Sequence, residues 1–354
     1  MKPKPSALNL SRSPRKLGYR MPAEWELHEA TWLSWPQDRE TWPKELEEVE
    51  AAYLEIIKHL HEGEQIRILV HGKAEEGRVS KWLREKGIKG NVFFHEIPTD
   101  SPWIRDYGPT FISNQMGSQG LVDWQFNAWG RKYDSFGRDD AVPGQIARLL
   151  DIQKFRSDLV MEGGAVEVNG RGVCLVTEEC LLNPNRNPSL GRTEIEGVLK
   201  DFLGLEQVIW LGEGIAGDDT DGHIDELARF VSQGIIAVAL EENLDDENFK
   251  QLQENWNRLS RALDQNGKPF KLVALPMPEK IEMNGKRFPA SYANFYMGNQ
   301  AVLVPTFRQK SDSKALGILA ELFPDRKVVG IDAIPLVYGQ GALHCITQQQ
   351  PLAQ

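Results

Sequence analysis

The stretch at residues 192–234 decides the fold, and it reads RTEIEGVLKDFLGLEQVIWLGEGIAGDDTDGHIDELARFVSQG. Apolar residues recur at helical spacing over 192–202, and a short apolar run typical of a buried strand follows at 208–211. A polar segment rich in glycine and aspartate occupies 217–226, and a turn at 232–234 then separates two apolar runs. The stretch therefore predicts one αβ unit made of a helix, a strand, a polar corner and a hairpin.

The same order of elements recurs along the chain. Further elements of this kind are predicted as helices at 47–60, 248–263 and 313–322, strands at 65–70, 272–275 and 327–331, and hairpin turns at 117–120, 169–172 and 298–300. The polar corners are marked by Asp106, Glu162, His223, the segment 291–294 and Cys345, at separations of 56, 61, 68 and 54 residues. A period of this length with one supersecondary unit per repeat indicates a repeat architecture.

A segment at 30–35, with a helix from 45, looks like another copy of the unit, so a closed ring would join the N- and C-terminal parts of the chain. We therefore expect one α/β domain of about five αβ modules, arranged around a central site where the corners meet. The alternative is that even spacing arises by chance, as it can in any α/β protein.

The composition excludes several classes of protein. The chain has 354 residues, with 41 lysines and arginines against 51 aspartates and glutamates, which gives a formal net charge of −10. This acidic balance argues against nucleic acid or an anionic membrane as a partner and favours a small cationic ligand. The longest apolar run, at 235–240, is far shorter than the roughly 20 residues that cross a bilayer.

The first twenty residues carry six basic side chains and no acidic one, and they lack the apolar segment of a secretory signal. We expect a disordered basic tail over 1–20, with an organellar transit peptide as the alternative, and a single domain over 21–354. Three cysteines cannot form a disulfide framework in a chain of this size, which favours the cytoplasm. The sequence does not give the oligomeric state, and a homo-oligomer stays open.

Cys345 is the candidate nucleophile. It follows a glycine-rich approach, GQGALHC at 339–345, in which Gly339 and Gly341 let a ligand come close to the backbone. Cys174 lies in an apolar strand and Cys180 follows two acids, so both are expected to be inert core residues. Because cysteine is among the most buried residue types, core filler also stays open for Cys345.

His223 is the histidine best placed to exchange protons with a cysteine. It lies in the corner GDDTDGHIDE at 217–226, and in an extended backbone His223 and Asp225 would project to the same face. His344 directly precedes the cysteine and is expected to have a packing or supporting role. The other five histidines are expected at the surface or at sheet edges.

Two further corners carry carboxylates, Asp106 in WIRD at 103–106 and Glu162 in EGG at 162–164. With Asp225 they would place three acids in one pocket, which is costly unless a cation binds there. A planar guanidinium held by two carboxylates presents a central carbon that a thiolate can attack, and Trp103 can stack on such a cation. One histidine can then protonate the leaving ammonia and activate water, without a metal.

Two other functions stay open on these residues. Asp218, Asp219 and Asp221, together with His223, could hold a divalent cation in a metal-dependent ureohydrolase that releases urea. The same aspartates are more simply explained as turn and capping residues before a strand. The third interpretation is a non-catalytic protein that binds cationic amines.

The sequence resembles agmatine deiminases, members of a guanidine-modifying superfamily that includes Porphyromonas-type peptidyl-arginine deiminases and shares a five-bladed αβ-propeller, or pentein, fold. The resemblance covers nearly the whole chain from Met21 onward. It rests on MPAEWE (21–26), WLSWP (32–36), WIRD (103–106), EGG (162–164), DGHIDE (221–226), NFY (294–296) and HCITQQ (344–349).

The resemblance implies a role for each candidate residue. The implied roles are nucleophile for Cys345, general acid and base for His223, support of His223 for Glu162, guanidinium binding for Asp106 and Asp225, and substrate contact for Trp103, Gly339 and Gly341. The implied reaction is hydrolysis of agmatine to N-carbamoylputrescine and ammonia through a thiouronium-type intermediate, with no cofactor and no metal. The approach to Cys345 departs from the glycine triplet and Asn-Ile-His-Cys of the family pattern, so another guanidino substrate is the alternative.

Overall fold

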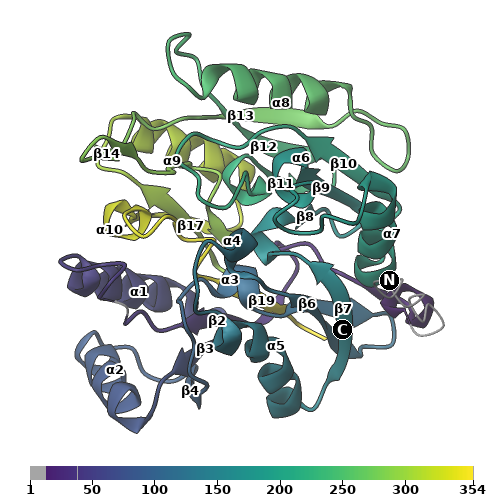
Figure 1. Cartoon of the computed structure of the whole chain (residues 1–354). Coiled ribbons are helices and arrows are strands. Elements are labelled where there is room, and N and C mark those ends of the chain that lie inside the picture. Colours follow the sequence, from purple (N-terminus) through teal and green to yellow (C-terminus); the bar gives the residue numbers. More distant parts are fainter. Residues whose placement is uncertain (1–12, 38, 354) are drawn as a thin grey trace.

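A computed structural model describes residues 13–37 and 39–353 of the chain (Figure 1). These residues form a mixed α/β fold with five sheets of three or four strands and one small two-stranded hairpin. Each of the five sheets contains an antiparallel pair whose second strand has a parallel neighbour on its other side. The unit predicted from 192–234 therefore occurs five times in the described part of the chain.

Each sheet has its own spatial order of strands. The orders are β1 (Tyr19–Arg20), β5 (Thr110–Asn114), β6 (Gln119–Gln125) and β7 (Gln153–Val160); β8 (Glu167–Val168), β9 (Val173–Thr177) and β10 (Gln207–Leu211); β11 (Ala228–Ser232), β12 (Ile235–Leu240) and β13 (Lys271–Pro276); β16 (Tyr296–Met297), β17 (Ala301–Thr306) and β18 (Lys327–Asp332); and β19 (Gln348–Pro351), β2 (His28–Ser34), β3 (Gln65–Val70) and β4 (Val92–Glu96). The small hairpin is β14 (Glu282–Met283) with β15 (Lys286–Arg287).

A helix joins the second strand of each antiparallel pair to its parallel neighbour, as parallel pairing requires. These helices are α5 (Gly137–Leu150), α7 (Arg192–Leu203), α8 (Phe249–Arg261), α9 (Ser311–Leu322) and α1 (Leu46–Leu60), and α2 (Lys73–Glu85) likewise leads from β3 to β4. In Figure 1 they lie toward the periphery of the molecule. The remaining helices are short: η2 (Pro14–Leu17), α3 (Ile104–Tyr107), α4 (Ala128–Arg131), η3 (Gly163–Ala165), α6 (Glu178–Leu181), η4 (Ile224–Glu226) and α10 (Ile334–Val337).

The four helices predicted from apolar periodicity are α1, α7, α8 and α9, each with ends within two residues of the prediction. The predicted strands are β3, β10, β13 and β18, with ends within one residue. The sequence analysis did not predict α2 or α5. In α2 only Val79 and Leu83 are buried, so its apolar stripe is too narrow to recognise, and Pro143 inside α5 argues against a helix.

The polar corners all lie at equivalent places in the fold. α3 leads into β5, η3 into β8 and η4 into β11, while turns at 291–294 and 343–346 lead toward β16 and β19. Pairing of β19 with β2 unites the C-terminal and N-terminal parts of the chain in one sheet, as expected. The closed five-bladed ring itself stays a prediction.

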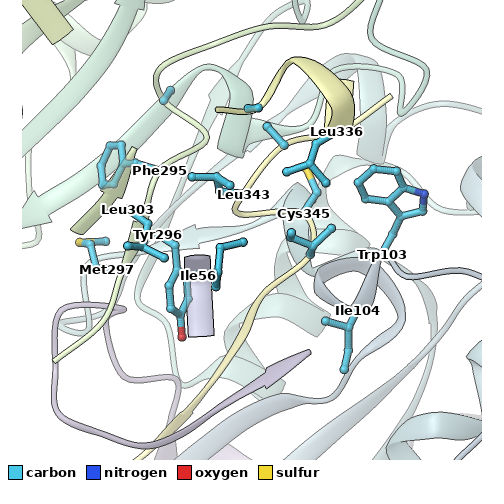
Figure 2. Close-up of a cluster of buried hydrophobic side chains, with 14 of the residues drawn as sticks. Ile56, Trp103, Ile104, Phe295, Tyr296, Met297, Leu303, Leu336, Leu343 and Cys345 are labelled. Carbon is cyan, nitrogen blue, oxygen red and sulfur yellow. The ribbon is translucent and has the colours of Figure 1, made fainter. Parts of the chain in front are cut away.

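Cys345 lies at one side of the larger apolar cluster of the core. Figure 2 shows it close to Trp103, Ile104 and Leu336, with Leu343 of the same turn directed into the cluster. The side chains of Ile104, Leu336 and Leu343 are fully buried. Burial of these apolar residues fixes the turn that carries the cysteine.

Residues 1–12 of the expected basic tail lie outside the described residues. The other part of that tail, 13–20, is folded, because Arg15 pairs with Glu206 at 2.6 Å and β1 extends the sheet of β5. The expectation of disorder therefore does not hold for residues 13–20. In the described part of the chain, no helix combines the length and the apolar character needed to cross a membrane.

Candidate active site

Four corners of the fold bring the predicted site residues together. Asp106 lies in α3, Glu162 immediately precedes η3, His223 and Asp225 lie at the start of η4, and Cys345 lies in the turn at 343–346. The side chains of all five residues are buried. They come from segments up to 239 residues apart in the sequence, so only the repeat of the fold places them in one site.

Cys345 lines a cavity with a volume of about 890 Å³, whose wall also includes Trp103 and Asp106. Its Sγ is 3.3 Å from Nδ2 of Asn294, in the fifth corner, and 4.0 Å from Oδ2 of Asp225. Burial raises the pKa of the Cys345 thiol well above its usual value, and the charges of the nearby carboxylates raise that pKa further. The thiol is therefore protonated when no cation occupies the cavity.

The imidazole of His223 lies between two carboxylates. Its Nδ1 is 3.6 Å from Oδ1 of Asp106, and its Nε2 is 3.9 Å from Oε2 of Glu162. Both nitrogens are buried without a hydrogen-bond partner among the described residues. Burial lowers the pKa of His223, but the charge of Asp106 and the neighbouring Cys180 and Glu162 outweigh it, so the pKa lies well above the usual value.

The expectation of an extended backbone at His223 and Asp225 is wrong. His223 itself is extended, with a φ of −60° and a ψ of 141°, but the 3-10 turn η4 follows at once and contains Asp225, so the alternation of a strand does not apply. The two side chains nevertheless meet at Gly164, where an added Cβ would lie 2.6 Å from Nδ1 of His223 and 3.1 Å from Oδ2 of Asp225. Oδ1 of Asp106 would lie 2.8 Å from the same Cβ. Three polar side chains thus surround one glycine.

Glu162 is fixed by an arginine that the sequence analysis did not identify. Nε of Arg186 donates to Oε1 of Glu162 at 2.7 Å, and both side chains are completely buried. Burial raises the pKa of Glu162, but the charge of Arg186 outweighs it and holds that pKa below its usual value. Arg186 also donates to Asp221 at 2.6 Å, so it connects the corner of Glu162 with that of His223.

Asp106 has neutral partners and no arginine. Its Oδ2 accepts from Nε1 of Trp129 at 2.8 Å, and its Oδ1 accepts from the backbone N–H of Gly164 at 3.1 Å. Burial raises the pKa of Asp106 to about 6, an effect that the charge of Asp225 reinforces and that of His223 opposes. Trp129 has a φ of 53°, which is unusual for a residue with a large side chain and puts its indole against this carboxylate.

Asp225 is held from one side only. Its Oδ2 lies 2.6 Å from Nδ1 of His344, whereas its Oδ1 is buried without a hydrogen-bond partner among the described residues. Burial raises the pKa of Asp225, but the hydrogen bond and the charge of His344 outweigh it, so the pKa lies below its usual value. The expected supporting role of His344 therefore takes the form of a direct contact with a site carboxylate.

The two glycines before Cys345 pack against tryptophans. A Cβ on Gly341 would lie 2.5 Å from the Trp103 ring, and a Cβ on Gly339 would lie 2.4 Å from the Trp42 ring. Trp103 and Gly339 line the cavity, as the expected contact with substrate requires. The glycines thus admit aromatic walls close to Cys345, in addition to the expected room for a ligand.

The Asp-rich segment considered for a metal is already occupied by protein donors. Asp218 accepts from the backbone N–H groups of Thr220, Gly222 and His223, and Asp221 pairs with Lys132 at 2.7 Å. Two other groups of three place their ligand atoms within 4.8 Å of one another; they are Glu162, Cys180 and His223, and Asp225, Glu226 and Cys345. Asp218 and Asp221 thus have the contacts of turn and ion-pair residues, in line with the alternative interpretation of this segment.

Several site residues were not identified from their position in the sequence. Arg186 lies in a loop and Trp129 in the four-residue helix α4, and neither segment has a periodic pattern. Only knowledge of the buried acids would have indicated that hydrogen-bond donors are needed there. Cys180 is buried as expected, yet its Sγ is 3.9 Å from Oε2 of Glu162. The expectation that His28 is a surface or edge residue is wrong, because it is buried with Nδ1 3.1 Å from Glu64.

Comparison with known protein families gives a match over most of the chain. Residues 20–351 match the model of the Porphyromonas-type peptidyl-arginine deiminases. A protein of Legionella pneumophila strain Philadelphia 1, provisionally named an agmatine deiminase, is 38% identical over 347 residues, which are 97% of this chain and 98% of that protein.

Solved structures give the same result. The agmatine deiminase of Enterococcus faecalis superposes with a TM-score of 0.90 and 32% identity, covering 97% of this chain and 98% of that one. A substrate-bound cysteine-to-serine variant of the C. jejuni agmatine deiminase gives a TM-score of 0.84 and 34% identity, over 94% and 96% of the two chains. A protein of Pseudomonas aeruginosa, DDAH, shares only the fold, with a TM-score of 0.50 and 12% identity over 91% of this chain and 99% of that one.

Proposed function

The chain belongs to the Porphyromonas-type peptidyl-arginine deiminase family, and we propose that it hydrolyses agmatine to N-carbamoylputrescine and ammonia. The observation that carries this proposal is the meeting of the Cys345 thiol with His223 and the carboxylates of Asp106 and Asp225 at one buried place. The names of the relatives at 32–38% identity give agmatine as the substrate. We also propose that residues 21–354 act as one catalytic domain and that the five modules close into a propeller, which the β19–β2 pairing supports.

The carboxylates account for binding of a guanidinium. Oδ1 of Asp225 lacks a partner among the described residues, and Asp106 has the ring of His223 at 3.6 Å but no hydrogen bond from it, so a planar cation between the two carboxylates would satisfy both. Trp103 forms an aromatic wall of the same cavity and would face the cation. A guanidinium held in this way has its central carbon next to Sγ of Cys345.

Substrate binding would also activate the nucleophile. The charges of Asp225 and Asp106 contribute to the raised pKa of the Cys345 thiol, and a bound guanidinium neutralises those charges. The thiol can then release its proton to solvent, and the sulfur attacks the central carbon to form a C–S bond and a neutral tetrahedral adduct. The reaction is thereby restricted to cationic substrates that fill the site.

His223 would serve the two proton transfers that follow. As an imidazolium it protonates one nitrogen of the adduct, the C–N bond breaks, and ammonia leaves a thiouronium on Cys345. The neutral imidazole then takes a proton from water, the oxygen adds to the carbon, and the C–S bond breaks to give the ureido product and the thiol. Glu162, itself fixed by Arg186, would keep the ring of His223 in place between these steps.

The cavity wall supports a substrate with a second positive charge. Its acidic lining residues are Glu40, Asp100, Asp106, Asp134, Asp139 and Asp219, and its basic ones are Arg138 and Lys286. Agmatine carries an ammonium group at the end away from the guanidinium, whereas arginine also carries a carboxylate there. The acidic wall therefore favours agmatine, and changes in Gln340 or Lys286 would test the alternative that another guanidino compound is preferred.

The test is product identification with chelator-treated protein and agmatine. Ammonia with N-carbamoylputrescine is the expected result, and Cys345→Ser is expected to abolish turnover while agmatine binding persists. Urea as the product, or activity only after a metal is restored, would instead support the metal-dependent ureohydrolase. Full activity in the serine variant would overturn the covalent mechanism, and turnover of arginine but not agmatine would overturn the substrate.

A further inference from the structure

A buried row of three side chains leads away from the site. Nδ1 of His344 lies 2.6 Å from Oδ2 of Asp225, and Nε2 of the same ring lies 2.8 Å from Oε2 of Glu24. All three side chains are at most 4% exposed. Glu24 comes from the segment before β2 and Asp225 from η4, so His344 connects two distant parts of the chain.

The geometry fixes the number of protons on His344. A carboxylate only accepts hydrogen bonds, and a neutral imidazole has one N–H donor. Both ring nitrogens of His344 face carboxylate oxygens at hydrogen-bond distance, so both must carry a proton to be satisfied. An imidazolium satisfies both contacts, whereas a neutral ring satisfies only one of them.

The groups around Glu24 keep it ionised and in place. Its Oε1 accepts from the backbone N–H of Met297 at 2.9 Å and lies 2.8 Å from Nη2 of Arg229. Its Oε2 accepts from Nη2 of Arg105 at 3.4 Å, in addition to His344. Burial raises the pKa of Glu24, but Arg229, His344 and Arg105 outweigh it and hold that pKa well below its usual value.

Burial raises the pKa of Glu167, and when Glu167 is nevertheless ionised, the charges of the surrounding groups balance only with a protonated His344. The acids that face one another here are Asp225, Glu24 and Glu167, and the bases are Arg105, Arg229 and His344. Arg229 joins Glu24 to Glu167, which lies 2.8 Å from its Nε. A neutral His344 would leave one buried carboxylate without a cation, which is strongly unfavourable.

We propose that His344 is a positioning residue, kept as a permanent imidazolium by Glu24, that turns Oδ1 of Asp225 toward the guanidinium and offsets part of the effect of the Asp225 charge on Cys345. The proposal rests on the proposed function for its effect on catalysis, but the protonation state of His344 follows from its contacts alone. One oxygen of Asp225 is taken by His344, which leaves the other for the substrate. The backbone N–H of His344 is itself held by Oδ1 of Asn294 at 2.9 Å, so the ring has little freedom.

A change at Glu24 would act on Cys345 through His344. With an amide in place of the Glu24 carboxylate, the second ring proton is no longer required, and His344 can become neutral as the pH rises. The charge of Asp225 would then act on the thiol without compensation and oppose formation of the thiolate. Turnover should fall, while the oxygen that binds the guanidinium keeps its place because Nδ1–H still donates to Asp225.

The first experiment is 15N NMR of the full chain with labelled histidine, between pH 6 and 9. The His344 signals are assigned by their loss in His344→Gln. We expect both ring nitrogens to stay protonated throughout in the native protein and to titrate in Glu24→Gln. A neutral His344 ring at pH 7.5 in the native protein would overturn the proposal, whatever the substrate of the enzyme is.

The second experiment compares kcat and KM for agmatine over the same pH range. Glu24→Gln should show a loss of kcat at alkaline pH of roughly ten- to a hundredfold, the equivalent of one charge-assisted hydrogen bond, with KM changed less than about threefold. A double variant that combines Glu24→Gln with His344→Gln should not show this loss of kcat at alkaline pH. A Glu24→Gln profile parallel to that of the native protein would overturn the proposed coupling.

Glu64→Gln is the matched control. Glu64 is also a buried carboxylate beside a histidine, 3.1 Å from Nδ1 of His28, but it does not contact His344. We expect both variants to lose a similar amount of stability, but only Glu24→Gln to lose kcat at alkaline pH. This result would show that Glu24 acts by positioning and not through a general loss of stability. If the chain turns over no guanidino substrate, the proposed function fails while the NMR result still decides the state of His344.

Discussion

Gly164→Ala is the substitution that best tests whether the site must hold its three polar groups in contact. The new methyl group would lie 2.6 Å from Nδ1 of His223, 2.8 Å from Oδ1 of Asp106 and 3.1 Å from Oδ2 of Asp225. Gly164 lies in η3 without a left-handed φ, so alanine meets no backbone strain there. The effect of the substitution is therefore steric and is directed at the site.

The distances give the size of the effect. Ordinary van der Waals contact begins at 3.4 Å, so the imidazole of His223 must retreat by about 0.8 Å to accommodate the methyl group. Displacement of a reacting group by about 1 Å costs on the order of a hundredfold in rate. Forcing a methyl group into a packed interior also costs about 1–3 kcal/mol in the free energy of unfolding. We expect kcat to fall about a hundredfold while the protein stays folded.

The assay is ammonia release from agmatine, with thermal unfolding measured on the same samples. Gly197→Ala is the matched control, because Gly197 lies on the exposed side of α7 with no atom within 4 Å of an added Cβ. That control should keep full activity and gain about 0.5–1 kcal/mol of stability, as expected for glycine replaced by alanine inside a helix. Native kcat and KM in folded Gly164→Ala would refute the close arrangement of His223, Asp106 and Asp225.

Three further outcomes follow from the charges of the site. Because the pKa of Asp106 is raised to about 6, and only its ionised form binds a guanidinium, kcat/KM for agmatine should fall about tenfold per pH unit below pH 6, and a flat profile down to pH 5 would contradict the assignment. Arg186→Gln leaves Glu162 buried and unpaired and should cost about 3–5 kcal/mol of stability at pH 7 in denaturant unfolding. The pKa of Glu162 is lowered in the folded protein, so its ionised form contributes stability above its unfolded pKa near 4.5. The stability difference between the native protein and Arg186→Gln should therefore shrink as the pH falls below that value. A difference that stays constant would count against the Arg186–Glu162 pair. Asp225→Asn should weaken agmatine binding in calorimetry as well as turnover, whereas unchanged binding would remove Asp225 from the guanidinium site.

The repeat of the fold could be predicted because it depends on local patterns. Apolar stripes indicated α1, α7, α8 and α9, and glycine-rich segments marked the corners that carry Asp106, Glu162 and Cys345. These signals lie within about fifteen residues of each other and need no knowledge of tertiary contacts. The position of each candidate in an equivalent corner then indicated that they could meet.

The partners of the site residues could not be predicted in the same way. Arg186 and Glu162 are 24 residues apart and His344 and Asp225 are 119 apart, and neither separation reflects a helix or strand period. The pairing is decided by which side chains are buried together, a property of the whole fold. The expected strand from His223 to Asp225 is likewise absent, because the 3-10 turn η4 replaces the extended backbone directly after His223.

The partners explain why the carboxylates differ. Glu162 has Arg186 and Asp225 has His344, and the pKa of each acid is lowered, whereas Asp106 faces only His223 and neutral donors and its pKa is raised. Asp106 is thus the acid whose charge the described residues compensate least, since His223 opposes its raised pKa without reversing it. A guanidinium that completes this balance also removes the negative field that keeps the Cys345 thiol protonated. Binding of the guanidinium and activation of Cys345 therefore both depend on the positive charge that the substrate brings to the site.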